Sequence, residues 1–259
     1  MKYIKNKAAS FHCTDDILPS LGRLSEIISR RPSCLEPFRG MNEEVKAIFS
    51  EGGFQLYPTV KKTTLLYERE SDCFFKILHP LNIKNRVLFH LNNRARSVYN
   101  ISGRLLSEGV KTASVIAYGR FNKGRSPFFV VRRAEGESLY EILIRGKRTL
   151  DRETYFNVIG EVAKIHRLGY RLGDAHLSHI FVKDGRVSGI IDLDSIRRNR
   201  FFFLKKLAKD IAGLNHPELP LTEDEKREIL YYYLNGAGIT KGKRFSRMIK
   251  HYTERRWKD

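Results

Sequence analysis

A predicted β-hairpin in the second half of the chain constrains the fold more than any other feature. Its strands, residues 180–182 and 187–191, are short and mainly apolar, and Lys183-Asp184-Gly185-Arg186 separates them. An Asp-Gly pair between two such runs is a strong signal for a tight turn. Asp174 precedes the first strand and Asp192 follows the second. We therefore expect both carboxylates at one edge of the hairpin.

Two carboxylates in this arrangement can divide the work of a phosphotransfer site. Asp174 can accept a proton from an attacking hydroxyl, whereas Asp192 can hold Mg²⁺ against nucleotide phosphates. Either residue alone would be interpreted as an ordinary loop or turn residue, because short motifs have a high false-positive risk. Their joint occurrence around one hairpin favours the catalytic interpretation. Asp194 is either an auxiliary metal ligand or a turn former.

The segment from Arg171 to Asp194 resembles the catalytic loop and metal-binding strand of the lipopolysaccharide core kinases. These bacterial enzymes phosphorylate heptose or Kdo sugars and share the protein-kinase-like fold. The most specific detail is His179, five residues after Asp174. Several core sugar kinases carry His there, where most kinase-like enzymes carry Asn. The resemblance covers roughly residues 55 to 255.

The resemblance implies an α+β, protein-kinase-like two-lobe fold with a small, mainly β N-lobe and a larger helical C-lobe. We expect an N-terminal extension at residues 1–50, the N-lobe at 51–133 and the C-lobe at 134–259. Within the first fifty residues, periodicity indicates short helices at 16–29 and 42–49. Three strands are expected at 54–57, 63–68 and 73–78.

The same resemblance implies ATP-dependent transfer of the γ-phosphate to a sugar hydroxyl, most simply on an inner-core heptose or Kdo. Asp174 would be the catalytic base, and Asp192 with His179 would hold Mg²⁺, with Mn²⁺ as an alternative. Lys76 would contact the nucleotide phosphates. Glu135 lies in a segment similar to the hinge linker that binds adenine. Asp210 is either a surface charge or, as we favour, a buried carboxylate that receives backbone amides of the catalytic loop.

Two features of the N-lobe depart from the kinase pattern. Lys76 lies within an apolar strand and needs an anionic partner, unless its stem extends to water at a strand edge. The helical pattern at residues 86–107 contains no acidic residue that could pair with it, and the loop at 58–62 has no glycine to cover phosphates. These departures keep a non-catalytic pseudokinase or nucleic-acid-binding module open as an alternative.

The chain carries 48 Lys and Arg against 29 Asp and Glu, a formal net charge of +19. Such an excess predicts an anionic partner: nucleic acid, an anionic membrane leaflet or a phosphorylated substrate. Arg197 and Arg198, just after Asp192, are placed to hold phosphate groups of the acceptor. Combined with the resemblance, the charge favours an anionic glycolipid or sugar at the anionic inner-membrane surface, with no nucleic acid. It disfavours the other alternative, a kinase-like enzyme for an aminoglycoside or a similar alcohol.

The cysteines, the histidines and the length of the apolar runs limit the chemistry and the cellular location that the sequence predicts. Three separated cysteines without a CxxC pair indicate neither a zinc site nor a disulfide framework. His176 and His179 alone are too few for a catalytic zinc site. No apolar run approaches the length of about 20 residues that a membrane span needs. We expect a cytoplasmic protein, at most peripheral on the inner membrane.

Overall fold

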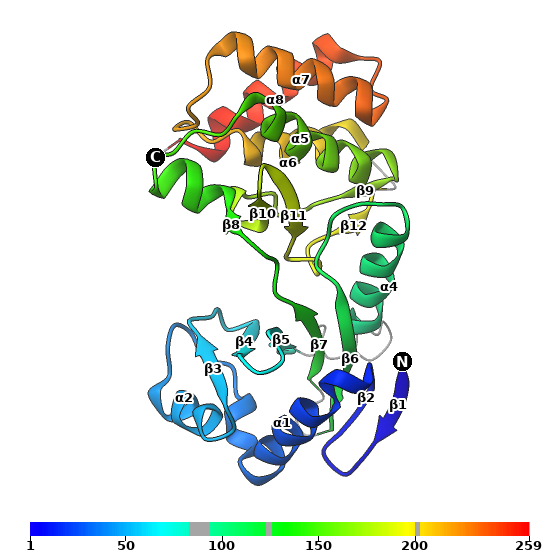
Figure 1. Ribbon diagram of the computed structural model, residues 1–259, viewed down its shortest axis with the longest axis vertical. Coiled ribbons are helices and arrows are strands. Elements are labelled where there is room, and N and C mark those ends of the chain that lie inside the picture. Colours follow the sequence, from blue (N-terminus) through cyan, green and yellow to red (C-terminus); the bar gives the residue numbers. More distant parts are fainter. Residues whose placement is uncertain (83–93, 123–125, 200–202, 259) are drawn as a thin grey trace. The chain divides into compact units, whose positions relative to one another are not determined.

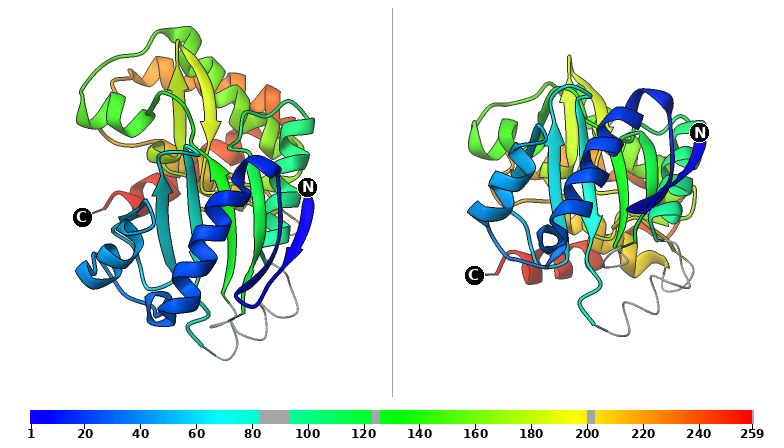
Figure 2. Two further views of the ribbon diagram at one scale, coloured as in Figure 1. Left: turned by 60° about the horizontal axis from the view of Figure 1, so that its bottom comes forward. Right: turned by 90° about the horizontal axis from the view of Figure 1, so that it is seen from below.

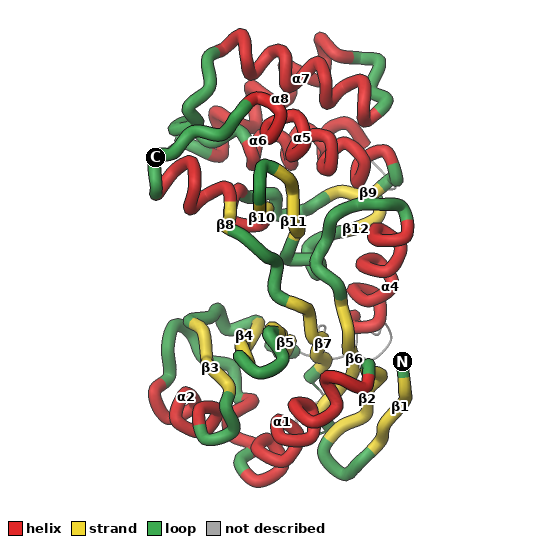
Figure 3. Tube along the Cα trace, viewed as in Figure 1, coloured by secondary structure: helices red, strands yellow, loops and turns green. Residues whose placement is uncertain are grey.

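The computed structural model describes residues 1–82, 94–122, 126–199 and 203–258. The chain divides into two compact units, each with its own set of helices and strands (Figures 1 and 3). Unit 1 comprises Met1–Gly103 and Ser114–Arg133, and unit 2 comprises Arg104–Ala113 and Ala134–Asp259. The boundary falls inside one helix, α4 (Arg94–Ser107). No helix in the described ranges is both long and apolar enough to span a bilayer.

Unit 1 is built on a seven-stranded antiparallel sheet with the order β1-β2-β6-β7-β5-β4-β3. The three predicted strands are confirmed as β3 (Phe54–Tyr57), β4 (Thr63–Glu68) and β5 (Cys73–Leu78). The other four strands are β1 (Lys2–Lys5), β2 (Ala9–Cys13), β6 (Val115–Phe121) and β7 (Pro127–Arg132).

Residues 1–50 are integral to this sheet and do not form an extension beside it. β2 pairs along its whole length with β6, and its alternate residues Ala9, Phe11 and Cys13 are buried on one face. The predicted helices are present as α1 (Leu18–Arg30) and α2 (Glu43–Ser50). α1 runs across one face of the sheet (Figure 2). A core cluster of α1, α2 and sheet residues joins them; it includes Leu21, Leu24, Phe49, Phe54, Phe75 and Phe128.

In its described residues, unit 2 combines short strands with a 3₁₀ turn, η5 (Leu177–His179), and with longer helices. Its helices are η4 (Tyr140–Arg145, a π-helical segment), α5 (Arg152–Arg167), α6 (Phe203–Leu214), α7 (Glu223–Ala237) and α8 (Gly242–Arg256). α5 packs against α7, and α6 packs against α8. Side chains fix two of the helix starts: Asp151 accepts a hydrogen bond from Thr154 N, and Thr222 with Glu225 forms a capping box.

The predicted hairpin is confirmed within unit 2. β10 (Ile180–Lys183) pairs with β11 (Arg186–Ile190), and β8 (Glu137–Ser138) completes a three-stranded sheet. Asp184 and Gly185 both have positive φ, 51° and 72°, as a two-residue type I′ turn requires. A separate two-stranded ladder joins β9 (Tyr170–Arg171) to β12 (Arg197–Arg198). Along the chain, Asp174 lies between β9 and β10, and Asp192 lies between β11 and β12.

Candidate active site

Asp174, His179 and Asp192 line one small cavity of unit 2, with a volume of about 10 Å³. Asp174 lies on the loop between β9 and the 3₁₀ turn η5 (Leu177–His179), and Asp192 lies two residues beyond the end of β11. The hydrogen bond from Ile191 N to His179 O, 2.9 Å, holds the loop and the strand end together. Three residues that the sequence predicts for one site are therefore close in space. Asp194, by contrast, is buried and is not among the residues that line the cavity.

The backbone of Asp192 has an unusual conformation. Its φ is +58°, a left-handed conformation that is uncommon for residues other than glycine but tolerated by Asp and Asn. The turn is fixed by the hydrogen bond from Ser195 N to Asp192 O, 2.9 Å, and the Ser195 hydroxyl donates to the Asp192 carboxylate. The chain thus keeps this carboxylate in a defined orientation at the cavity wall.

Asp210 of α6 binds the backbone of the loop that carries Asp174. Asp210 is 3% exposed and accepts hydrogen bonds from Leu172 N (2.7 Å) and Gly173 N (3.1 Å). This confirms the predicted buried carboxylate. His166 Nε2 lies 3.3 Å from the same carboxylate, and His166 Nδ1 lies 2.7 Å from the Tyr233 hydroxyl. Burial raises the pKa of Tyr233, so this phenol stays protonated.

Gly173 connects the loop to the segment that follows Asp192. Its φ is +82°, and a Cβ built there would lie 2.4 Å from the Ser195 carbonyl oxygen. Only glycine permits this approach without a shift of one of the two backbones. The position immediately before Asp174 is therefore dictated by the packing of the two carboxylate-bearing segments on each other.

His179 is held in the form that can bind a metal. Its Nδ1 lies 3.0 Å from the backbone oxygen of Asp174. A carbonyl oxygen only accepts, so Nδ1 carries the hydrogen, and in the neutral ring Nε2 keeps a free lone pair. A metal-binding imidazole commonly donates its other N–H to a carbonyl in this way.

The donor set fits a divalent ion whose coordination is completed by phosphates and water. The protein would supply an Asp192 oxygen and His179 Nε2. Among the described residues, no group of three or more His, Cys, Asp or Glu side chains is placed to hold a metal by itself. Mg²⁺ sites that act on nucleotides commonly use one or two carboxylates together with substrate phosphates. An imidazole ligand suits Mn²⁺ better than Mg²⁺.

The two predicted acceptor arginines lie on the β9–β12 ladder. Arg197 is directly opposite Arg171, and Arg198 is opposite Tyr170. Arg197 Nη1 donates to the Ile196 carbonyl at 2.7 Å, and neither Arg197 nor Arg198 lines the cavity of the carboxylates. Like charges directly opposite each other on neighbouring strands are unfavourable. No sequence pattern indicated a role for Arg171, and its place opposite Arg197 follows only from the strand pairing.

The remaining predicted residues lie elsewhere. Glu135, in unit 2, pairs with Lys183 Nζ at 2.5 Å, and its backbone oxygen accepts a hydrogen bond from the Ser188 hydroxyl. Lys76 is a half-buried residue of β5 in unit 1, opposite Leu65 and Phe129. The predicted helical pattern at residues 86–107 was expected to supply a partner for Lys76, and its first part, residues 86–93, lies outside the described residues.

A residue from the end of the chain approaches the predicted base. Arg256 Nη2, in the last turn of α8, lies 3.7 Å from Asp174 Oδ1. The segment at residues 241–258 is rich in Lys and Arg, but no sequence pattern connects it to Asp174. Eighty-one positions separate the two residues, so no local sequence pattern can predict this contact.

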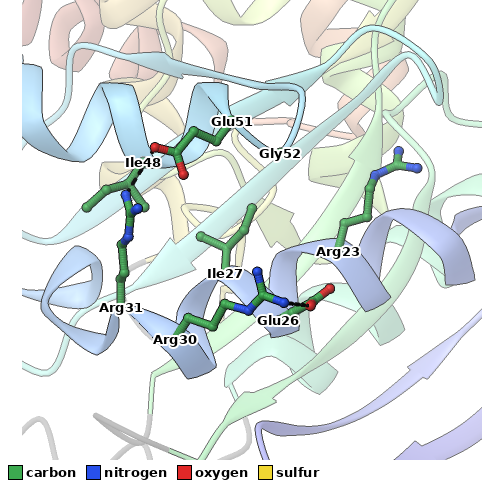
Figure 4. A pocket seen from close by; sticks show the side chains of 8 residues that line it. All are labelled: Arg23, Glu26, Ile27, Arg30, Arg31, Ile48, Glu51 and Gly52. Carbon is green, nitrogen blue, oxygen red and sulfur yellow. Dashed lines mark hydrogen bonds and ion pairs between the residues drawn. The ribbon is translucent and has the colours of Figure 1, made fainter.

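A hollow in unit 1 is lined by none of the predicted site residues. It measures about 340 Å³ and is lined mainly by α1 and α2 (Figure 4). Its arginines are compensated: Arg30 pairs with Glu26, Arg31 with Glu51, and Arg23 with Glu68 and Glu70. With its cations paired, the hollow has no excess charge that would attract an anion.

Comparison with known proteins identifies the fold. No protein-family model and no curated protein matches the sequence. The aminoglycoside-3'-phosphotransferase of type VIII matches in structure with a TM-score of 0.50 and 13% identity, over 77% of this chain and 94% of that one. The bifunctional kinase-methyltransferase WbdD matches at 0.46 and 14%, over 74% and 47%. Vaccinia related kinase 3 matches at 0.36 and 16%, over 56% and 48%.

The chain has a protein-kinase-like two-lobe α+β fold, as the sequence predicted. The phosphotransferase match carries this conclusion, together with the mainly β unit 1 and the largely helical unit 2. The chain spans about half the length of the WbdD chain that it matches. Identities near 14% establish the fold alone.

Proposed function

We propose that this protein is an ATP-dependent phosphotransferase that transfers the γ-phosphate to a sugar hydroxyl. The observation that carries the proposal is the convergence of Asp174, His179 and Asp192 on one cavity, with the Asp174 loop held by a buried carboxylate. The fold shared with an aminoglycoside phosphotransferase is consistent with it. The acceptor we infer is an inner-core heptose or Kdo of lipopolysaccharide.

Each residue would have a distinct role. Asp174, which is 62% exposed, would accept the proton of the attacking hydroxyl. Asp192 and His179 Nε2 would hold Mg²⁺ or Mn²⁺, and the bound ion would neutralise charge on the transferred phosphoryl group. Lys76 would contact nucleotide phosphates, and the segment around Glu135 would bind adenine. Arg197 and Arg198 would bind phosphate groups of the acceptor.

The charge of +19 bears on the acceptor and the location. A cationic aminoglycoside would be repelled by it, whereas an anionic glycolipid would be attracted. We infer that the protein acts on the cytoplasmic side of the inner membrane as a peripheral protein, without a nucleic-acid partner.

The roles of the two carboxylates can be separated by substitution. Asp192→Asn should abolish metal-dependent ATP binding, because it removes the carboxylate that meets the metal. Asp174→Asn should retain ATP binding and lose about 10²- to 10⁴-fold in transfer, the usual contribution of a general base. Calorimetry with Mg-ATP measures binding, and labelled ATP with a lipopolysaccharide core oligosaccharide measures transfer.

Asp184→Asn is the matched control. Asp184 is an exposed acid at the turn of the same hairpin and, like Asp192, has a positive φ that Asn accepts. It should behave as the parent in both assays. Equal loss of ATP affinity in Asp174→Asn and Asp192→Asn, with folding intact, would refute the division of roles.

A further inference from the structure

Four aromatic rings from separate segments gather beside the Asp174 loop. Tyr140 comes from η4, His176 from the loop itself, His216 from the residues after α6, and Trp257 from the residue after α8. The ring centroids are 4.4 Å apart for His216 and Trp257, and 5.6 Å apart for Tyr140 and His176. Tyr140–His216 and His176–Trp257 are 6.4 and 6.5 Å apart. All four residues are partly exposed, so the cluster lies at the surface of unit 2 and is not part of its core.

The packing of α8 on α6 fixes this cluster. Trp257 Nε1 donates to the Ala212 carbonyl oxygen at 3.2 Å. At the next residue, a Cβ on Gly213 would lie 2.4 Å from the Ala175 carbonyl oxygen and 2.9 Å from Arg256 Nη1. The absence of a side chain at Gly213 therefore allows α6 to approach both the catalytic loop and the guanidinium. Trp257 is positioned by its hydrogen bond to the backbone of α6, and the Arg256 guanidinium occupies the space that a side chain at position 213 would fill, so both are held in place, as rigid binding residues require.

Arg256 connects the ring cluster to the predicted base. Its Cζ lies 5.6 Å from the centre of the Trp257 ring, and its Nη2 lies 3.7 Å from Asp174 Oδ1. The latter separation exceeds that of a charge-assisted hydrogen bond, about 2.7–2.9 Å. The Arg256 side chain is 34% exposed. Its N–H groups can therefore reach a ligand that approaches Asp174.

We propose that these rings and Arg256 form the acceptor subsite, and that the acceptor is a sugar with an anionic substituent near the reacting hydroxyl. The proposal rests on the function proposed above and names its substrate class. Aromatic side chains offer apolar faces to the C–H surface of a sugar ring, and a few polar groups set its orientation. Arginine favours planar, bidentate recognition of carboxylate and phosphate. An anion bound there would bring its neighbouring hydroxyl to Asp174.

Trp257 is the only tryptophan of the chain, so its fluorescence reports directly on the subsite. The full-length protein is titrated with glucuronate, glucose 6-phosphate, glucose and glucosamine, without nucleotide. We expect a saturable change in emission with the two anionic sugars at about tenfold lower concentration than with glucose, or lower still, and the weakest response with glucosamine. The two anionic arms distinguish carboxylate from phosphate recognition.

Two variants isolate the guanidinium. Arg256→Gln should lose about tenfold or more in affinity for the anionic sugars and bind glucose as the parent does. Arg256→Lys should keep part of the preference, because it retains the charge without the planar fork. Arg255→Gln, an exposed neighbour on the same helix, should bind all four sugars like the parent.

The outcomes separate this proposal from the phosphotransferase proposal. Binding is measured without ATP, so an inactive protein that still prefers anionic sugars through Arg256 supports the subsite and counts only against phosphotransfer. Equal responses to all four sugars, or equal losses in Arg256→Gln and Arg255→Gln, would overturn the subsite even if transfer to a sugar were demonstrated. If Arg256 merely positions Asp174, Arg256→Gln lowers transfer and leaves sugar affinity unchanged, which also overturns it.

Discussion

At the scale of single residues, His79 gives the molecule a definite acid sensitivity. It is 3% exposed, at the end of β5, with Nε2 2.8 Å from Thr64 Oγ1. Burial lowers its pKa to about 4. In the unfolded chain a histidine titrates near 6.5, so above that pH the ring is neutral in both states. Between about pH 6.5 and 4 only the unfolded chain gains the proton, and the free energy of unfolding falls.

The expected loss from this group alone is up to about 3 kcal/mol across that interval. Urea unfolding at pH 7, 6 and 5 measures it. His79→Gln removes the titrating group and should flatten the dependence over this range, whatever it does to stability at pH 7. His251→Gln, at an exposed histidine, should keep the slope of the parent. A parent-like slope in His79→Gln would assign the acid sensitivity to other groups.

The residues that could be predicted from the sequence are those whose neighbours are close along the chain. Asp174, His179 and Asp192 lie within nineteen positions, and the Asp-Gly turn between them fixes how they meet. Arg256 and Trp257 could not be predicted, because their places depend on how α8 packs on α6. The left-handed backbone at Asp192 is compatible with its residue type, but an Asp adopts many other conformations and does not by itself predict this one.

At the scale of elements, Asp210 links α6 to the catalytic loop and to two other helices. It accepts from the loop amides and contacts His166 of α5, which in turn contacts Tyr233 of α7. Asp210→Asn puts an amide where an acceptor-only carboxylate stands, so one or more buried donors lose their partner. We expect a loss of about 2–3 kcal/mol in the free energy of unfolding and a large loss of transfer, because the loop is no longer fixed.

Tyr233→Phe provides the comparison for Asp210→Asn. It removes only the hydrogen bond to His166 and should cost about 1 kcal/mol while transfer is retained. Urea unfolding and the transfer assay are applied to both variants. If the two variants lose transfer equally, the Asp210 bonds to the loop have no special role.

Elements with a strong local pattern were predicted, and elements that depend on pairing partners were not. β3, β4 and β5 match their predicted ranges, since their apolar residues alternate and polar turns bound them. β1 and β2 were missed as strands. β1 is mostly exposed, and β2 is specified mainly by its contact with β6, over one hundred residues later. The two-residue strands β9 and β12 carry no periodic signal at all.

At the scale of the whole molecule, the fold was predicted from one motif, whereas the prediction of a binding partner depends on the distribution of charge. The net charge of +19 is not neutralised by the ion pairs of the fold. For example, the exposed α8 residues Lys243, Arg244 and Arg247 have no ion pair among the described residues. Each Lys or Arg near an anionic lipid surface contributes about 1 kcal/mol. The membrane partner proposed above therefore requires only a few such residues to act together.

We expect the protein to sediment with vesicles that contain anionic lipid and to remain in the supernatant with neutral vesicles. The field of the surface decays over about 8–10 Å near physiological ionic strength, so binding should weaken steeply as salt is raised. Charge reversal at Lys243, Arg244 and Arg247 should weaken it further, whereas the same number of reversals among acidic residues of α7 should not. Equal partitioning to both vesicle types would contradict the membrane proposal.

Displacement from anionic vesicles by duplex DNA at low concentration would instead favour the nucleic-acid alternative, because DNA competes for the same cations with a denser array of phosphates.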